Sequence, residues 1–191
     1  MNKTNNKILF CDFNGVISYN LFWSKYAHCN ASLQAIFGTD LVNEWMKGRK
    51  TSEEINRIFA DISSLEYEVV MADFILDCQN LDIDNDILRQ IKAKIGYIKI
   101  LATNNMDCFD RWVIPSHPEL EETFDYIHNS SNLGFLKQEN NYFDLNNKLF
   151  NASNSIHIDD SQTICDIANS QNIKTFCISG VDNVLQALKQ I

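Results

Sequence analysis

The sequence KILFCDFNGVI (residues 7–17) is the stretch from which the fold can be worked out. It opens with the apolar run Ile8–Cys11 between polar residues, a pattern that predicts a short buried strand. Asp12 follows where this strand should end, and Gly15 lets the backbone turn sharply. Alone, Asp12 could be an ordinary strand-end residue. However, α/β sheets bind ligands at the carboxyl ends of their strands, so we place the candidate chemistry at Asp12.

Composition limits the class of protein. The chain has 191 residues, of which 45% are hydrophobic and 21% charged, and this balance is typical of a globular protein. Its length suits one domain with a substantial insertion, or two small domains. The net charge of −9 argues against nucleic acid or an anionic membrane as the main partner.

The six cysteines show neither a CxxC pair nor the Cys/His spacing of a zinc site. The first residues are polar and lack the apolar core of a signal peptide. No apolar run approaches the ~20 residues that span a bilayer. We therefore expect a reduced, cytoplasmic protein. The expected oligomeric state is a monomer or a homodimer.

Helical and strand-like patterns then follow one another along the chain. Residues 18–94 look helical throughout, and Thr51 with Glu54 forms a capping-box pattern at the start of one helix. Further strands are expected at residues 97–102, 124–128, 155–158 and 173–178. Helices are expected between and after them, at residues 106–112, 142–150, 161–170 and 182–190. Strands that alternate with helices predict an α/β fold with a parallel sheet and right-handed crossovers.

Polar residues follow several of these strands. Asp12, Thr103 and the pair Asp159-Asp160 each come at a strand end, so a parallel sheet should bring them to one edge. Lys137 lies in a loop from which its long amine could reach that edge. Carboxylates from two strands suit Mg²⁺, which prefers oxygen ligands. A hydroxyl and an ammonium group suit the oxygens of a phosphoryl group in transfer.

These motifs together resemble those of the haloacid dehalogenase (HAD) superfamily of hydrolases. The matches are a strand with DxxGV at residues 12–16, a strand ending in Thr103, Lys137 in LGFLK, and a strand ending in Asp159-Asp160. The residues around these motifs resemble those of the family branch that contains sugar-phosphate phosphatases and the phosphatase-like domain of epoxide hydrolases. The resemblance implies a Rossmann-like, doubly wound sheet of order 3-2-1-4-5. It also implies a catalytic core of residues 1–17 and 95–191, with an α-helical cap inserted at residues 18–94.

The resemblance also implies roles for single residues. Asp12 would be the nucleophile and pass through an aspartyl-phosphate. Four residues would hold Mg²⁺: Asp12, the backbone carbonyl of Asn14, Asp159 and Asp160. Thr103 and Lys137 would bind the phosphoryl oxygens, assisted by Asn104. The implied partner is a small phosphorylated metabolite.

Asn14 departs from the family pattern. Phosphatases of this family carry a second Asp at this position, two residues after the nucleophile, as general acid and base. An amide keeps the backbone contact to the metal but cannot shuttle a proton. Losing general acid–base catalysis typically costs ~10²–10⁴ in rate. Esters with poor leaving groups should suffer most, and aryl or acyl phosphates least.

Three functions therefore stay open at this point. The first is a Mg²⁺-dependent phosphatase, slow or selective for good leaving groups. The second is a catalytically weakened protein that binds or senses a phosphorylated ligand. The third is hydrolysis of a carbon–halogen bond, which needs no Mg²⁺ and leaves the acidic pair unexplained.

The helical segment should close over the site and choose the substrate. By position, its candidates for substrate contact are Tyr19, Asn20, Trp23, Arg49 and Lys50. Phe22 and Trp23 fit core packing better. We interpret His157, inside a strand, as a core histidine, and Asp107 and Asp110 as acids at a helix start that could also face substrate.

Overall fold

The computed structural model describes residues 7–20, 22–139, 142–143 and 152–191. Its centre is a five-stranded sheet of order β3-β2-β1-β4-β5 in which every neighbouring pair is parallel. The strands are β1 (Lys7–Cys11), β2 (Tyr97–Thr103), β3 (Tyr126–Asn129), β4 (Ser155–Asp159) and β5 (Lys174–Cys177). The predicted α/β class and strand order are confirmed. The order reverses beside β1, so the chain leaves β1 at the switch point where such sheets bind ligands.

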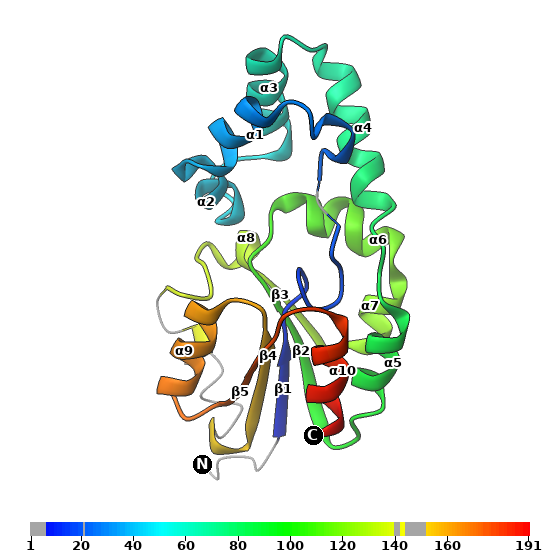
Figure 1. The fold of residues 1–191 in the computed structure, drawn as a ribbon, viewed down its shortest axis with the longest axis vertical. Coiled ribbons are helices and arrows are strands. Elements are labelled where there is room, and N and C mark those ends of the chain that lie inside the picture. Colours follow the sequence, from blue (N-terminus) through cyan, green and yellow to red (C-terminus); the bar gives the residue numbers. More distant parts are fainter. Residues whose placement is uncertain (1–6, 21, 140–141, 144–151) are drawn as a thin grey trace.

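Strand β1 is buried on both faces because helices cover the sheet on each side. Ile8 and Phe10 belong to one apolar cluster, and Leu9 and Cys11 to the other, as the period of two along a strand requires. Helix α9 (Gln162–Ser170) covers the first face. The second face carries α5 (Asn85–Lys92), α7 (Pro118–Thr123) and α10 (Val181–Lys189) (Figure 1).

A group of helices stands beyond the carboxyl edge of the sheet (Figure 1). This helical group consists of η1 (Ser24–Tyr26), α1 (Asn30–Phe37), α2 (Asp40–Met46), α3 (Ser52–Ser63) and α4 (Tyr67–Gln79). Aromatic rings fill its centre: Trp23 stacks on Phe59 at a centroid distance of 4.7 Å, and Trp45 and Phe74 pack beside them. The capping box predicted at Thr51 and Glu54 is present at the start of α3.

Helix α5 lies within the predicted cap range of residues 18–94 but not with the helical group. Its side chains Ile87, Leu88 and Ile91 are buried, and the helix packs on α7 and α10 beside the sheet. Residues 18–94 therefore contain both the helical group and one helix that covers the sheet. The division of the chain at these residues stays a prediction.

Short helical turns lie between the longer helices and strands. The π-helical turn η2 (Phe109–Val113) packs against α4 and continues into α6 (Ile114–Ser116). It occupies most of the region where the sequence predicted a helix at residues 106–112. Helix α8 (Ser130–Leu133) follows β3, and η4 (Ala152–Asn154) precedes β4. The helix expected at residues 142–150 falls largely outside the described residues.

No helix in the described ranges is both long and apolar enough to cross a membrane. All six cysteines fall within those ranges and are free thiols.

Candidate active site

The carboxyl edge of the sheet gathers the acidic residues that the sequence placed there. Asp12 follows β1, Asp159 ends β4 and Asp160 comes next in the chain. Each offers a carboxylate oxygen, and these three oxygens lie within 4.8 Å of one another. Asp12 and Asp159 are buried, so the cluster is partly withdrawn from water. Such crowded carboxylates repel one another unless a cation lies among them.

Lys137 supplies a positive charge to this cluster. Its Nζ lies 2.9 Å from Asp12 Oδ1 and 2.7 Å from Asp159 Oδ2. The lysine is only 3% exposed, although a lysine is almost never fully buried unless it is paired. The loop after α8 thus brings Lys137 to the sheet edge, as the sequence predicted.

The pKa values follow from burial and from these pairs. Burial raises the pKa of Asp12 to about 7 against the effect of Lys137, and the charge of Asp159 adds to the rise. Burial also acts on Asp159, but Lys137 and His157 lower the pKa of that carboxyl below its ordinary value. Burial alone would lower the pKa of Lys137, whereas Asp12 and Asp159 raise it. The lysine is therefore charged and Asp159 ionised at neutral pH.

Gly15 lets Asp160 approach the turn after β1. A Cβ atom at position 15 would lie 2.2 Å from Asp160 Oδ2, and the backbone there has a φ of +75°. Only glycine meets both demands without strain. The turn predicted at Gly15 therefore also leaves the space that the Asp160 carboxylate occupies.

Thr103 and Asn104 differ in their hydrogen bonds. The Thr103 hydroxyl is buried and has no hydrogen-bond partner among the described residues, an unusual state for a buried polar group. The Asn104 side chain accepts a hydrogen bond from the Lys137 backbone N–H at 2.8 Å and donates one to Gln138 at 2.9 Å. Thr103 thus has a hydroxyl to offer a ligand, while Asn104 holds the Lys137 loop in place. Anion binding by Asn104 stays a prediction.

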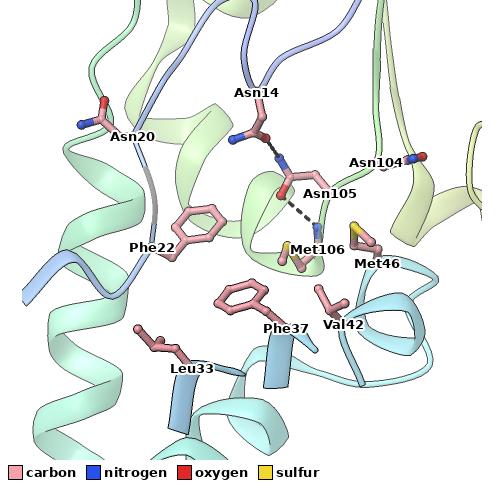
Figure 2. A pocket seen from close by; sticks show the side chains of 10 residues that line it. All are labelled: Asn14, Asn20, Phe22, Leu33, Phe37, Val42, Met46, Asn104, Asn105 and Met106. Carbon is pink, nitrogen blue, oxygen red and sulfur yellow. Dashed lines mark hydrogen bonds between the residues drawn. The ribbon is translucent and has the colours of Figure 1, made fainter. Parts of the chain in front are cut away.

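Asn14 is held by a residue that the sequence analysis did not single out. The Asn105 side-chain amide donates a hydrogen bond of 3.1 Å to Asn14 Oδ1, and its own oxygen accepts one from the Met106 N–H (Figure 2). The Asn14 amide nitrogen remains as a hydrogen-bond donor. The signal for Asn105 in the sequence was its place two residues after Thr103.

His157 is a core histidine, as predicted, and it also lies beside the carboxylate cluster. Its ring is buried against Phe10 and Phe143, as expected. Its Nε2 lies 3.2 Å from Asp159 Oδ2, on the side chain two residues further along β4. The period of two along a strand places both residues on one face, and this spacing was the available signal.

The candidates in the helical segment separate by position. Asn20 and Phe22 line a pocket beside the site, whereas Trp23 is buried inside the helical group. Arg49 pairs with Glu44, and Lys50 with Glu54. Tyr19 is exposed and lines a different hollow. The structure therefore brings Asn20 toward the site. Phe22 packs on Phe74 at a ring-centroid distance of 5.3 Å, in line with the expected core packing, and also lines the pocket.

Asp107 joins the helical group to the rest of the molecule. Its Oδ1 accepts hydrogen bonds from Trp45 Nε1 at 2.8 Å and from Ser52 Oγ at 2.7 Å. Arg111 donates to its Oδ2 at 2.8 Å and binds Glu53 of α3 with the same guanidinium. Asp110, the other acid noted at this helix start, accepts hydrogen bonds from Asn129 and Asn132.

The donor set of the carboxylate cluster fits a hard divalent cation. Asp12, Asp159 and Asp160 offer only oxygen, the ligand that Mg²⁺ and Ca²⁺ prefer. An ionised Asp12 beside a cation and a lysine is a suitable nucleophile, because its charge is balanced while one oxygen stays available. The unpartnered Thr103 hydroxyl offers a donor for an anion at the same edge.

Comparisons with known proteins support the fold. No family model matches the chain, and no curated protein matches it significantly. Solved structures do match, among them a HAD family enzyme from Bacteroides thetaiotaomicron with a TM-score of 0.71 and 21% identity over 94% of this chain and 97% of that one. The same enzyme in complex with magnesium and inorganic phosphate matches with a TM-score of 0.72 and 22% identity, over 90% and 93% of the two chains.

Two further structures extend the likeness. A predicted HAD-like family hydrolase from Porphyromonas gingivalis has a TM-score of 0.69 and 18% identity, and the match covers 97% of each chain. The L-2-haloacid dehalogenase from Xanthobacter autotrophicus has a TM-score of 0.64 and 11% identity over 89% of this chain and 76% of that one. At these identities the likeness concerns the fold. The chain has the fold of HAD family enzymes along most of its length.

Proposed function

We propose that this chain is a Mg²⁺-dependent hydrolase of the HAD superfamily that removes phosphate from small phosphorylated metabolites through Asp12. The observation that carries the proposal is the position of Lys137 between Asp12 and Asp159, with the Asp160 carboxylate beside them. The proposed nucleophile, the Lys137 ammonium group and the carboxylate oxygens that would bind the metal then lie together at the carboxyl edge of the sheet. Within residues 18–94, the helical group serves as the cap in this proposal, whereas α5 covers the sheet.

Magnesium is the proposed cofactor because of the oxygen-only cluster, and the complexes of the Bacteroides enzyme support it. Asp12, Asp159, Asp160 and the backbone carbonyl of Asn14 would hold the ion. A bound divalent cation offsets the repulsion among the carboxylates and the negative charge of a phosphoryl group. It would also favour the ionised form of Asp12, whose pKa burial otherwise raises to about 7.

In the first half of the reaction, Asp12 attacks phosphorus. Asp12 Oδ1 accepts a hydrogen bond from the Phe13 N–H at 2.8 Å and contacts Lys137, so Oδ2 is the oxygen that attacks. A bond forms between Oδ2 and phosphorus, and the bond from phosphorus to the leaving oxygen breaks. Lys137 and the Thr103 hydroxyl stabilise the charge on the phosphoryl oxygens.

In the second half, water attacks phosphorus and releases the Asp12 carboxylate. Asn14 lies where a general acid and base would be needed, but its amide can form hydrogen bonds and cannot transfer a proton. The leaving oxygen therefore takes its proton from water, and the attacking water gives its proton to the phosphate product. We expect turnover to be slow for esters with poor leaving groups.

Asn14 also supports a second candidate function, that of a binding protein for a phosphorylated ligand. Its side chain is held by Asn105 and would keep the shape of the site without proton transfer. In this case Asp12, Thr103, Lys137 and Asp160 would bind the phosphate and release it unchanged.

Steady-state assays separate the two candidates. Acetyl phosphate, p-nitrophenyl phosphate and a set of sugar phosphates are tested with and without Mg²⁺, with Asp12→Asn as the inactive control. Mg²⁺-dependent release of phosphate that the control lacks supports the hydrolase. Phosphate binding without turnover, with turnover in Asn14→Asp, favours the binding protein. Halide release from a haloacid without metal contradicts both.

A further inference from the structure

A pocket of about 450 Å³ opens between the helical group and the loops that follow β1 and β2. This volume is within the range of small-molecule sites, ~300–1,000 Å³. Asn14, Asn104 and Asn105 line it on the side of the sheet, so it adjoins the proposed phosphate site. A group esterified to a phosphate at Asp12 would extend into this pocket.

The helical side of the pocket is apolar. The rings of Phe22 and Phe37 point into it, and Leu33, Val42 and Met46 complete this wall (Figure 2). Met106, in the loop after β2, adds a second sulfur-bearing side chain to the lining. The ten described lining residues carry no charge. Phe37 is 46% exposed, so water contacts this large ring unless a ligand covers it.

This lining selects among classes of substrate. A sugar carries hydroxyl groups on every side, and those facing the phenylalanine and methionine side chains would lose their water without a hydrogen-bond partner. A flat aromatic group suits two phenylalanine rings and two thioethers, because rings and sulfur make favourable contacts with aromatic faces. The four lining amides, Asn14, Asn20, Asn104 and Asn105, leave room for one or two polar atoms.

The chemistry of Asn14 favours the same class of substrate. Without a general acid, the leaving group must depart as an anion that is stable by itself. A phenolate is such an anion, whereas an alkoxide from a sugar is not. We propose that the substrate is an aryl phosphate, a phosphate monoester of an uncharged, apolar phenol, whose ring occupies this pocket. This inference rests on the proposed function and names its substrate class.

The overall reaction balances without a proton donor from the protein. Asp12 forms a bond to phosphorus, and the aryl oxygen leaves with the electron pair of the broken P–O bond. The Asn14 amide nitrogen donates a hydrogen bond to that oxygen without losing its proton. The phenolate then takes a proton from water, and hydrolysis of the aspartyl-phosphate yields phosphate. One ester and one water give one phenol and one phosphate.

The test uses substrates matched in leaving-group acidity, so that only the apolar contact differs. The first pair is 2-naphthyl and phenyl phosphate, and the second is benzyl and ethyl phosphate. We expect kcat/KM to be about tenfold higher or more for the larger member of each pair. Equal values within each pair, or faster hydrolysis of glucose 6-phosphate than of 2-naphthyl phosphate, would overturn the inference.

A charge placed in the pocket should remove this preference. In Phe37→Lys the ratio of kcat/KM between 2-naphthyl and ethyl phosphate should fall by about tenfold. Leu76→Lys is the matched control, because Leu76 is also an exposed apolar residue but lies on α4 outside the pocket lining. Val42→Lys serves as a second pocket variant if Phe37→Lys does not fold. An unchanged ratio in a folded pocket variant contradicts the inference.

Equilibrium binding separates this inference from the proposed function. Binding of 2-naphthyl phosphate and ethyl phosphate to Asp12→Asn is measured by calorimetry. Tighter binding of the naphthyl ester by about tenfold supports the pocket assignment even where the wild type shows no turnover. Turnover of acetyl phosphate without any preference for aryl esters, in binding or in kinetics, leaves the hydrolase intact and overturns the aryl assignment.

Discussion

Asn105 donates a hydrogen bond from its side-chain amide to Asn14 Oδ1 across 91 residues of sequence, at a distance of 3.1 Å. This bond fixes which end of the Asn14 amide faces the proposed substrate. The oxygen is directed to Asn105, so the NH₂ group is the part that can meet a leaving oxygen. The same bond would equally accommodate a carboxylate at position 14.

Asn14→Asp should therefore restore an acid in a position that is already formed. We expect kcat for ethyl phosphate to rise by ~10²–10⁴, with a much smaller gain for acetyl phosphate, whose leaving group needs no proton. Steady-state kinetics on both substrates measure the difference. Asn85→Asp, at the exposed start of α5, is the control. A gain of the same size for both substrates would argue against proton transfer at position 14.

Removing the positive charge between Asp12 and Asp159 should destabilise the protein. Lys137→Met leaves two buried carboxylates without their partner, which typically costs ~3–5 kcal/mol. Urea unfolding without metal measures this loss, and added Mg²⁺ should recover part of it. Lys25→Met changes an exposed pair and should cost under ~1 kcal/mol. Equal effects of the two variants would show that Lys137 does not neutralise the cluster.

Magnesium should stabilise the wild type. A ligand that binds only the folded protein raises its stability by about 2.7 kcal/mol at a concentration 100 times the Kd. The melting temperature should rise with Mg²⁺ concentration, and Asp160→Asn should shift this titration to higher concentration. Asp61→Asn, an acidic residue of α3, should leave the titration unchanged. A melting temperature that is independent of Mg²⁺ would contradict the proposed metal site.

Asp107 should determine how firmly the helical group is attached. Asp107→Ala leaves Trp45 Nε1 and Ser52 Oγ without their acceptor, at about 1–3 kcal/mol for each orphaned donor. Hydrogen exchange should become faster in α2 and α3 while β1 stays protected. Asp86→Ala, on the exposed surface of α5, is the control. Uniform changes over all elements would mean that the contact does not act locally.

The pair of Glu53 and Arg111 should make stability depend on pH. The hydrogen bonds from Arg111 hold the pKa of Glu53 at about 2, although partial burial opposes the shift. In the unfolded chain a glutamate titrates at ~4.3, so the contribution is complete above that pH and is lost as pH falls toward 2. Urea unfolding between pH 5 and pH 3 should show a smaller loss in Glu53→Gln than in the wild type. Glu68→Gln, at an exposed position of α4, is the control.

The sheet could be predicted from sequence because each strand carries its own signal. Runs such as Ile8–Cys11 are apolar on both faces, and helical patterns between such runs require parallel strands. The convergence of Asp12 with Asp159 follows directly, since parallel strands end at the same edge. The loop position of Lys137 predicted that its amine could reach this edge, but not its burial between Asp12 and Asp159, because a lysine in a loop has no pattern that places it in a buried pair.

The contacts between the two layers could not be predicted in this way. Trp45 meets Asp107 across 62 residues, and nothing in the local sequence of either residue signals the partner. Phe22 packs against the core of the helical group as expected, but its place in the pocket lining was not predicted. Its place depends on how the helical group sits above the sheet, which is a property of the assembled molecule.

The bond between Trp45 and Asp107 gives the protein an intrinsic spectroscopic reporter. The indole N–H of Trp45 comes from the helical group, whereas its acceptor belongs to the segment that follows β2. Any separation of the two layers breaks this bond and changes the environment of the indole. With Trp23 and Trp112 replaced, the emission of Trp45 would report the loss of this bond in solution, on protein without an added label.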